Sequence, residues 1–279
     1  MALHPLVFMS DFGWKERFVA SMKGVALQVD PEIRIFDITH EIKPFDVWSA
    51  GQVLAGTLPY WPKGTVFVSV VDPGVGTQRS SLVAETESGH YVVSPDNGTF
   101  TFIEEQVGIR EAREIDERKH RLSASKQSHT FHGRDIYAYT GAKLAAGKIS
   151  FKKVGTVVKR PLEKLPYQPA RFLQGFIEGL VMKIEQPFGN VVTNIPDEFL
   201  LDLTTDKQQP LVKVEIIHRG QLIFAEEIPF VKSYGYVPLN APLLYIDSVY
   251  QVGIALNQGD FAQTYAIKPG ADWLIRLQV

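Results

Sequence analysis

The residues most able to do chemistry lie in loops that follow strand-like runs of the sequence. A near-continuous β-branched and aromatic run over residues 65–71 stops at Asp72, and the glycines of the next turn allow close backbone approach to a ligand. Arg79 lies seven residues after Asp72, so its guanidinium can fold back and pair with that carboxylate. The pattern predicts a charged pair presented to a ligand, with a surface salt bridge at a tight turn as the alternative.

Two further loops carry an acid or a histidine. Residues 130–135 place polar side chains around a glycine just before a helical pattern. His132 in this loop can orient or exchange a proton near pH 7, although a single histidine is more often structural. Asp135 is expected to cap the helix that follows. In Ser10-Asp11-Phe12-Gly13 the acid follows a strand-like run, and a ligand contact competes there with a cap or turn role.

The second half of the chain offers one loop of this kind. Residues 186–194 present an aromatic side chain and two amides, and the alternative is a hairpin turn with Asn190 in the left-handed conformation. We interpret residues 95–98 as an ordinary asparagine-glycine turn. His40 and Glu41 could join a metal site, but the chain has no cysteine and no closely spaced histidine pair. The sequence therefore predicts no dedicated metal site, no disulfide and no cysteine nucleophile.

The elements that must position these loops change in character along the chain. Strand-like runs alternate with helical spacing at 18–29, from residue 47 and at 136–146. This alternation predicts a mostly parallel sheet flanked by helices. Three strand-like runs end in Asp11, Asp37 and Asp72, so these acids are expected along one rim, where open α/β sheets bind ligands.

Beyond the midpoint the elements become short and strand-like. Strands are predicted at Phe176–Ile184, Leu211–Ile217, Leu222–Ile228, Gln251–Leu256, Ala262–Ile267 and Trp273–Val279. Prolines at 161, 166 and 169 among polar residues indicate a linker. We therefore predict an α/β protein with an N-terminal α/β domain over 1–158, a linker over 159–170 and a C-terminal all-β, barrel-like domain over 171–279.

Composition limits the class of protein. The chain has 279 residues, of which 45% are hydrophobic and 22% charged, as in ordinary globular domains. Its 29 basic and 31 acidic residues give a net charge of −2. The sequence shows no basic stripe that would neutralise a run of phosphates, so we expect no nucleic-acid partner. The start shows no cationic region followed by a long apolar core, and no segment approaches 18 apolar residues. These features predict a cytoplasmic enzyme.

Taken in order, the motifs resemble those of one family, the S-adenosyl-L-methionine (SAM) hydroxide adenosyltransferases, which are related to the adenosyl fluoride and chloride synthases. The resemblance rests on Ser10-Asp11-Phe12-Gly13, Met22-Lys23-Gly24, Asp37-Ile38-Thr39-His40, Pro44-Phe45-Asp46-Val47, Gly64-Thr65-Val66-Phe67, Val71-Asp72-Pro73-Gly74-Val75-Gly76-Thr77, Pro95-Asp96-Asn97-Gly98, Phe131-His132-Gly133-Arg134-Asp135 and Pro187-Phe188-Gly189-Asn190. It extends from Leu6 nearly to the C-terminus. It implies an α/β domain followed by a β-barrel-like domain, and a homotrimer with ligand sites between subunits.

The resemblance also implies a reaction. Family hydrolases hold a water with an Asp, an Arg and a His, and the matching catalytic residues are Asp72, Arg79 and His132. In the halogenating relatives the position of Asp72 looks like a tyrosine, and the fluorinating members carry a long insertion that this chain lacks. The expected activity is hydrolysis of SAM to adenosine and L-methionine by attack at the ribose C5′, with no metal and no cofactor. The alternatives are an adenosyl halide synthase and a non-catalytic adenosine or SAM sensor.

Substrate-binding residues follow from the same resemblance. Asp11 matches the carboxylate that chelates the ribose hydroxyls, Phe45 an aromatic on the ligand, and Glu185 an acid facing the methionine ammonium. Asn190 and Phe188 match the adenine contacts, and Ser248 matches the serine that binds the methionine carboxylate. Phe131, Tyr234 and Val249 complete the expected set. Family members more often show Asn-Ser-x-Gly where this chain has Asp247-Ser248-Val249-Tyr250, so Asp247 and Tyr250 depart from the pattern.

Overall fold

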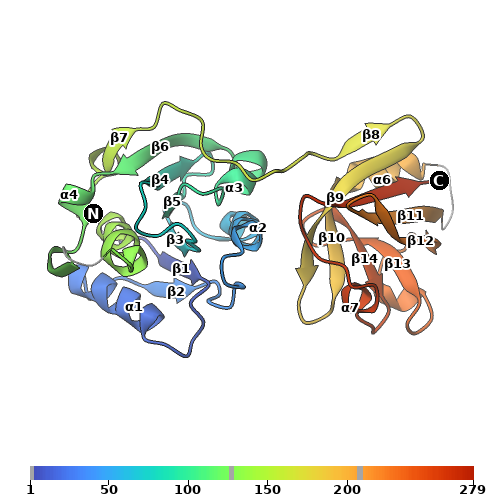
Figure 1. Cartoon of the computed structure of the whole chain (residues 1–279), viewed down its shortest axis with the longest axis horizontal. Helices are drawn as coiled ribbons and strands as arrows, with labels where there is room; N and C mark the ends of the chain where they lie inside the picture. The colour runs from blue at the N-terminus through green and yellow to red at the C-terminus, as the bar shows by residue number, and fades with distance from the viewer. Residues whose placement is uncertain (1–2, 126–128, 206–209) are drawn as a thin grey trace. The chain divides into compact units, whose positions relative to one another are not determined.

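A computed structural model describes residues 3–125, 129–205 and 210–279 of the chain (Figure 1). The chain divides into two compact units, residues 1–165 and 166–279. The division falls inside the predicted linker, whose limits at 159 and 170 stay a prediction. Residues before it are tied to the first unit, since Glu163 N–H donates to Asp96 Oδ1 at 3.0 Å. Gln168 O, just after it, accepts from Asn194 Nδ2 in the second unit at 2.8 Å.

The first unit is built on one seven-stranded sheet with the order β2-β1-β3-β5-β4-β6-β7. Its strands are β1 (Leu6–Ser10), β2 (Ile35–Asp37), β3 (Val66–Val70), β4 (Ser81–Thr86), β5 (Tyr91–Pro95), β6 (Ile109–Ile115) and β7 (Gly155–Val157). The pairs β1 with β2, β1 with β3 and β3 with β5 are parallel. The remaining pairs are antiparallel, so only β4 and β7 run against the other strands.

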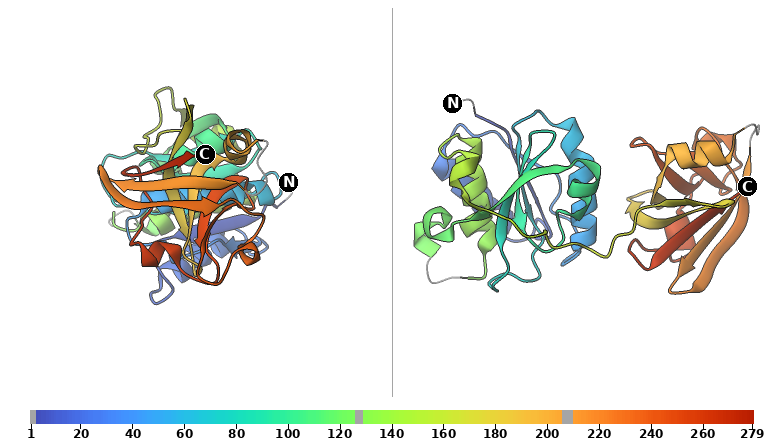
Figure 2. Two further views of the ribbon diagram at one scale, coloured as in Figure 1. Left: turned by 90° about the vertical axis from the view of Figure 1, so that its right-hand side faces the viewer. Right: turned by 90° about the horizontal axis from the view of Figure 1, so that it is seen from above.

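Helices cover both faces of this sheet, as the edge-on view in Figure 2 shows. On one face lie α1 (Phe18–Val29), the π-helical segment η3 (Gly133–Ala138) and α5 (Tyr139–Ala145), and on the other α2 (Val47–Thr57) and α3 (Thr101–Gln106). The short helices are α4 (Glu117–His120) and the 3-10 turns η1 (Leu58–Tyr60), η2 (Ser123–Ser125) and η4 (Phe151–Lys153). The predicted helices at 18–29 and after Pro44 are confirmed, and helix 136–146 is confirmed as the end of η3 followed by α5.

The predicted capping role of Asp135 is wrong. His132 occupies the N-cap position of η3, and no side chain caps that segment. Asp135 lies inside the segment with no exposed surface, and its Oδ1 accepts from Arg134 Nε at 2.6 Å. The π-helical winding begins earlier than the apolar periodicity, which moved Asp135 from the boundary into the core.

The second unit is an antiparallel sheet that nearly closes into a barrel, with the order β12-β11-β15-β9-β10-β14-β13 and β8 paired to β9. Its strands are β8 (Arg171–Leu173), β9 (Phe176–Glu185), β10 (Asn190–Pro196), β11 (Leu211–His218), β12 (Gln221–Pro229), β13 (Pro242–Ile246), β14 (Gln251–Leu256) and β15 (Trp273–Gln278), with η5 (Tyr234–Tyr236) and the helices α6 (Asp197–Leu203) and α7 (Phe261–Thr264). A bridge between Phe230 and Leu244 brings the two end strands together. The predicted barrel-like domain is confirmed.

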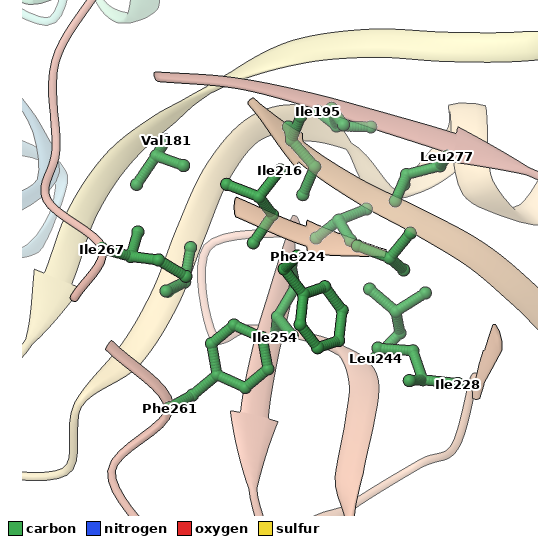
Figure 3. Close-up of a cluster of buried hydrophobic side chains, with 14 of the residues drawn as sticks. Val181, Ile195, Ile216, Phe224, Ile228, Leu244, Ile254, Phe261, Ile267 and Leu277 are labelled. Atoms are coloured by element: carbon green, nitrogen blue, oxygen red, sulfur yellow. The ribbon is translucent and has the colours of Figure 1, made fainter. Parts of the chain in front are cut away.

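Aliphatic and aromatic side chains from all around this barrel fill its interior (Figure 3). The predicted strand Ala262–Ile267 is wrong, because Phe261–Thr264 form the helix α7. Asp260 begins this helix by accepting Gln263 N–H at 2.7 Å, which is the ordinary role of an N-cap acid. Phe261 packs its ring 5.1 Å from that of Phe224. Burial of one helical turn produced an apolar pattern that resembles a strand. Among the described residues, no helix is long and apolar enough to cross a membrane.

Candidate active site

Parallel pairing brings the three strand-end acids to one edge of the first unit's sheet. In the registers, Ser10 pairs with Val70 and Phe8 pairs with Asp37, so Asp11 and Asp72 follow neighbouring strand ends. The predicted shared rim is therefore confirmed. Asp37 is already engaged there, because its carboxylate pairs with Lys23 and with His40 Nε2.

The carboxylate of Asp72 has one saturated oxygen and one oxygen without a partner. Arg79 Nη2 donates to Oδ2, and the hydroxyl of Tyr137 lies 3.4 Å from the same atom. Oδ1 is buried and has no hydrogen-bond partner among the described residues. Burial raises the pKa of Asp72, whereas the charge of Arg79 and, to a smaller extent, the nearby backbone N–H of Gly74 oppose that shift. The predicted pairing of Asp72 with Arg79 is confirmed, and the pair is buried: the Asp72 side chain is 5% exposed.

Tyr137 is a member of this cluster that sequence reasoning missed. Its ring has no exposed surface, and its hydroxyl accepts from Arg79 Nη1 at 3.1 Å and from Ser81 Oγ at 3.2 Å. The same hydroxyl is left with its proton for Asp72. Burial and the nearby carboxylate raise the pKa of Tyr137, so the phenol stays protonated. Its one sequence signal was its place near the start of the predicted helix 136–146.

His132 is also buried, and only one of its ring nitrogens has a partner. Arg121 Nη2 lies 3.1 Å from Nε2, whereas Nδ1 is buried with no partner among the described residues. Burial, followed by the charges of Arg121 and Arg79, lowers the pKa of His132 to about 4. The imidazole is therefore neutral near pH 7.

Two glycines allow the loops of Asp72 and His132 to approach each other. A Cβ on Gly76, which has φ of +80°, would lie 2.8 Å from the carbonyl oxygen of His129. A Cβ on Gly133 would lie 3.1 Å from Val70 Cγ1 at the end of β3. Both positions therefore require glycine, because a Cβ at these distances would be closer to its neighbour than ordinary carbon contacts allow. The two loops are thus packed together behind the strand end.

Asp11 and Phe45 form a second group in the first unit. Asp11 Oδ2 accepts the backbone N–H of Phe45 at 2.9 Å, and Phe45 adopts a left-handed φ of 69°. Burial raises the pKa of Asp11. The ring of Phe45 is 69% exposed, which leaves an aromatic face available beside a held carboxylate.

Phe131 is held in an aromatic cluster of its own unit. Its ring lies edge-on to Phe12 at 5.8 Å and to Phe18 at 5.3 Å. The guanidinium of Arg134 lies 5.0 Å from the ring centre. These contacts give Phe131 a packing role, and its predicted substrate contact stays a prediction.

In the second unit, Asn190 joins two of the predicted binding residues. Its Nδ2 donates to Glu185 Oε2 at 3.3 Å and to the Tyr234 hydroxyl at 3.2 Å. Tyr245, which sequence reasoning missed, donates to the same Glu185 oxygen at 3.4 Å. The left-handed alternative for Asn190 is wrong: Gly189 takes that conformation with φ of 71°, and Asn190 begins β10. A Cβ on Gly189 would collide with Asp260, so the turn requires glycine there.

A pocket of about 510 Å³ opens beside this group, lined by Pro187, Phe188, Asn190, Tyr234 and the turn from Leu256 to Asp260. Phe188 is 66% exposed, so its ring can receive a planar ligand. Aromatic side chains with a few polar groups among them are typical of the lining of small-molecule sites.

Ser248 and Val249 lie in the turn between β13 and β14. Asp247 Oδ1 accepts the N–H groups of Val249 and Gln251, both at 2.9 Å. An asparagine carbonyl could accept the same two bonds, so Asp247 preserves the turn despite its departure from the family pattern. Tyr250 has a left-handed φ of 62°, a position that suits the glycine of the pattern.

Comparison with known proteins decides the family. Residues 6–155 match the SAM hydroxide adenosyltransferase N-terminal domain, and residues 179–274 match the C-terminal domain. The chain belongs to the SAM hydroxide adenosyltransferase family. A protein of Methanocaldococcus jannaschii named (R)-S-adenosyl-L-methionine hydrolase is 36% identical over 82% of this chain and 80% of its own length. A Fluorinase of Actinoplanes is 27% identical over 95% of each chain. The crystal structure of an uncharacterized conserved protein from Thermotoga maritima matches with a TM-score of 0.86 and 34% identity, covering 98% of this chain and all of that one.

In this member of the family the predicted residues fall into separate clusters. Asp72, Arg79 and His132 gather at the carboxyl edge of the first sheet, together with Tyr137 and Arg121. Glu185, Asn190 and Tyr234 are hydrogen-bonded to one another in the second unit. His40 bonds to Ser10 Oγ at 2.7 Å and to Asp37, so it supports the sheet edge. The described residues contain no group of three or more acids and histidines arranged to hold a metal ion.

Proposed function

We propose that this protein hydrolyses SAM to adenosine and L-methionine by attack of water on the ribose C5′. The observation that carries the proposal is the buried, unpartnered Oδ1 of Asp72, beside an oxygen already saturated by Arg79 and Tyr137. A buried acceptor without a partner is costly unless a ligand or water fills it. Members of the family named as SAM hydrolases support the choice of substrate.

The proposed step balances without a metal or a cofactor. The water oxygen forms a bond to C5′ while the C5′–S bond breaks, and the electron pair stays on sulfur as the neutral thioether of methionine. The leaving group therefore needs no acid. The water gives a proton toward Asp72 Oδ1, whose raised pKa makes it a better acceptor, and the proton then passes to solvent.

Binding roles are proposed for the remaining residues. Asp11, with Oδ2 on the Phe45 N–H, would receive the ribose hydroxyls. Phe188 and Asn190 would hold the adenine at the pocket of the second unit. Ser248 would bind the methionine carboxylate and Glu185 its ammonium.

Halide transfer is the second candidate, since Fluorinases are among the relatives. An Asp72 carboxylate beside the nucleophile repels an anion, and this favours water. A non-catalytic sensor does not need a buried ion pair such as Asp72 and Arg79, because removing two charges from water costs free energy. We also propose a homotrimer, as the family resemblance implies, and a cytoplasmic location, as the composition and the start of the sequence predict.

The test is a chromatographic assay of SAM breakdown with both sulfonium epimers, with and without chloride, and with a chelator. We expect adenosine and methionine in equal amounts under all these conditions for the accepted epimer. In heavy-oxygen water the label should enter the 5′ oxygen of adenosine. A halogenated nucleoside in chloride, or label at another position, would overturn the proposal.

A further inference from the structure

The pairing of Arg121 with His132 decides where the histidine carries its proton. Arg121 Nη2 lies 3.1 Å from His132 Nε2. A guanidinium only donates hydrogen bonds and stays protonated, so Nε2 must be the lone-pair nitrogen. A neutral imidazole with a lone pair on Nε2 has its proton on Nδ1.

The Nδ1 atom of this tautomer is a buried donor with no acceptor among the described residues. Its neighbour Arg79 holds Asp72, whose Oδ1 is a buried acceptor with no partner. Arg79 is close enough to His132 for its charge to act on that ring. The donor on His132 and the acceptor on Asp72, both without a partner, thus lie near the same guanidinium, that of Arg79.

We propose that Arg121 is a positioning residue that fixes His132 as the Nδ1–H tautomer, so that His132 donates a hydrogen bond to the attacking water and does not act as its base. The identity of the water rests on the proposed function, whereas the tautomer does not. Water can accept from His132 and donate to Asp72 at once. A halide ion has no proton to donate, so this pair of groups also selects water.

Arg121 is itself anchored. Its Nη2 lies 3.3 Å from Glu117 Oε2, one helical turn earlier, and its side chain is 13% exposed. Among the described residues, the charged groups with the largest effects on His132 are Arg121, Arg79 and His129, which disfavour the imidazolium, and Asp135, which favours it. The surroundings therefore keep the ring neutral, which a fixed donor requires.

The first test reads the tautomer directly by nitrogen NMR of protein labelled at histidine, with the His132→Gln variant used to assign the signal. We expect His132 in the wild type to show a protonated Nδ1 and an unprotonated Nε2 at pH 7. Arg121→Met should give a mixture of tautomers, and Arg121→Lys, which keeps a donor, should restore the wild-type pattern. Arg118→Met is the matched control, because Arg118 is 91% exposed. An Nε2–H tautomer in the wild type would overturn the inference.

The second test separates a donor from a base. The Asn side chain places an amide N–H near the position of Nδ1, and that of Gln places one near Nε2. We expect His132→Asn to keep turnover at least about 10-fold above His132→Gln, with KM for SAM similar in both. Equal loss in the two variants would contradict the donor role. If the tautomer is as expected but no SAM is cleaved, the proposed function fails and the tautomer assignment stands.

Discussion

Arg79 donates to one carboxylate oxygen of Asp72 and leaves the other buried and unpartnered. An ion pair formed for stability alone would satisfy both oxygens, because an unmet buried acceptor costs about 1–3 kcal/mol. The one-sided arrangement fixes the carboxylate while reserving Oδ1 for a ligand.

Replacing Asp72 by asparagine should lower turnover far more than it weakens binding. Asparagine keeps the shape of the side chain but loses the charge that accepts the water's proton, and loss of such a group typically costs about 100-fold to 10,000-fold. We expect kcat for adenosine release to fall by that factor, with a much smaller change in KM. Asp116→Asn, at the start of α4, is the control and should be near normal. If Asp72→Asn is folded by circular dichroism and has near-normal turnover, the proposed mechanism is wrong.

Tyr137→Phe should move the acid limb of the pH–rate profile. The Tyr137 hydroxyl bonds to Asp72 and thereby lowers the pKa of that carboxyl, which burial has raised. Activity needs the ionised carboxylate, so kcat/KM falls as pH drops through the pKa of Asp72. Loss of the hydroxyl raises this pKa further, and the fall should begin at a higher pH. Tyr139→Phe, two residues later in α5, should leave the profile in place. A common acid limb for all three proteins would exclude this role for Tyr137.

How much of this site the sequence predicted depends on how far apart along the chain the contacting residues lie. Asp72 and Arg79 share one loop, so residue type and spacing were sufficient to pair them. Tyr137 and Arg121 come from other segments, and only the packing of η3 beside β3 and the contact of Arg121 with His132 place their polar atoms there. No local pattern in one sequence carries that information.

The fold shows the same limit. The apolar runs that became β1 and β3 were recognisable because both of their faces are buried. By contrast, β6 mixes buried and half-exposed residues and carries charges on both sides, so it gave no strand signal. The helix α7 gave a false strand signal, because Phe261 and Ile267 are apolar residues buried in the core of the barrel.

Acid should destabilise the wild type more than a His132→Gln variant. The pKa of His132 is about 4 in the folded protein against an ordinary 6.5, so between these pH values the unfolded chain binds more protons. The contribution of the neutral histidine to stability is therefore complete above pH 6.5 and is lost as the pH falls toward 4. We expect the free energy of unfolding in urea to fall less between pH 7 and pH 5 for His132→Gln than for the wild type. His40 and His120, whose pKa values are also lowered by burial, remain in both proteins. An identical loss would contradict the buried, neutral state of His132.

Tyr250→Gly should stabilise the second unit. Tyr250 adopts φ of 62° and its side chain is 70% exposed, so the substitution removes a strained conformation and little packing. A non-glycine residue in this region costs on the order of 1–3 kcal/mol, and part of the gain is offset by the greater freedom of glycine in the unfolded chain. We expect the free energy of unfolding to rise by about 1 kcal/mol in urea. Tyr236→Gly is the matched control, because Tyr236 is similarly exposed at 67% but has no positive φ, and it should destabilise. Should both variants lose stability equally, the strain assigned to Tyr250 would be absent in solution.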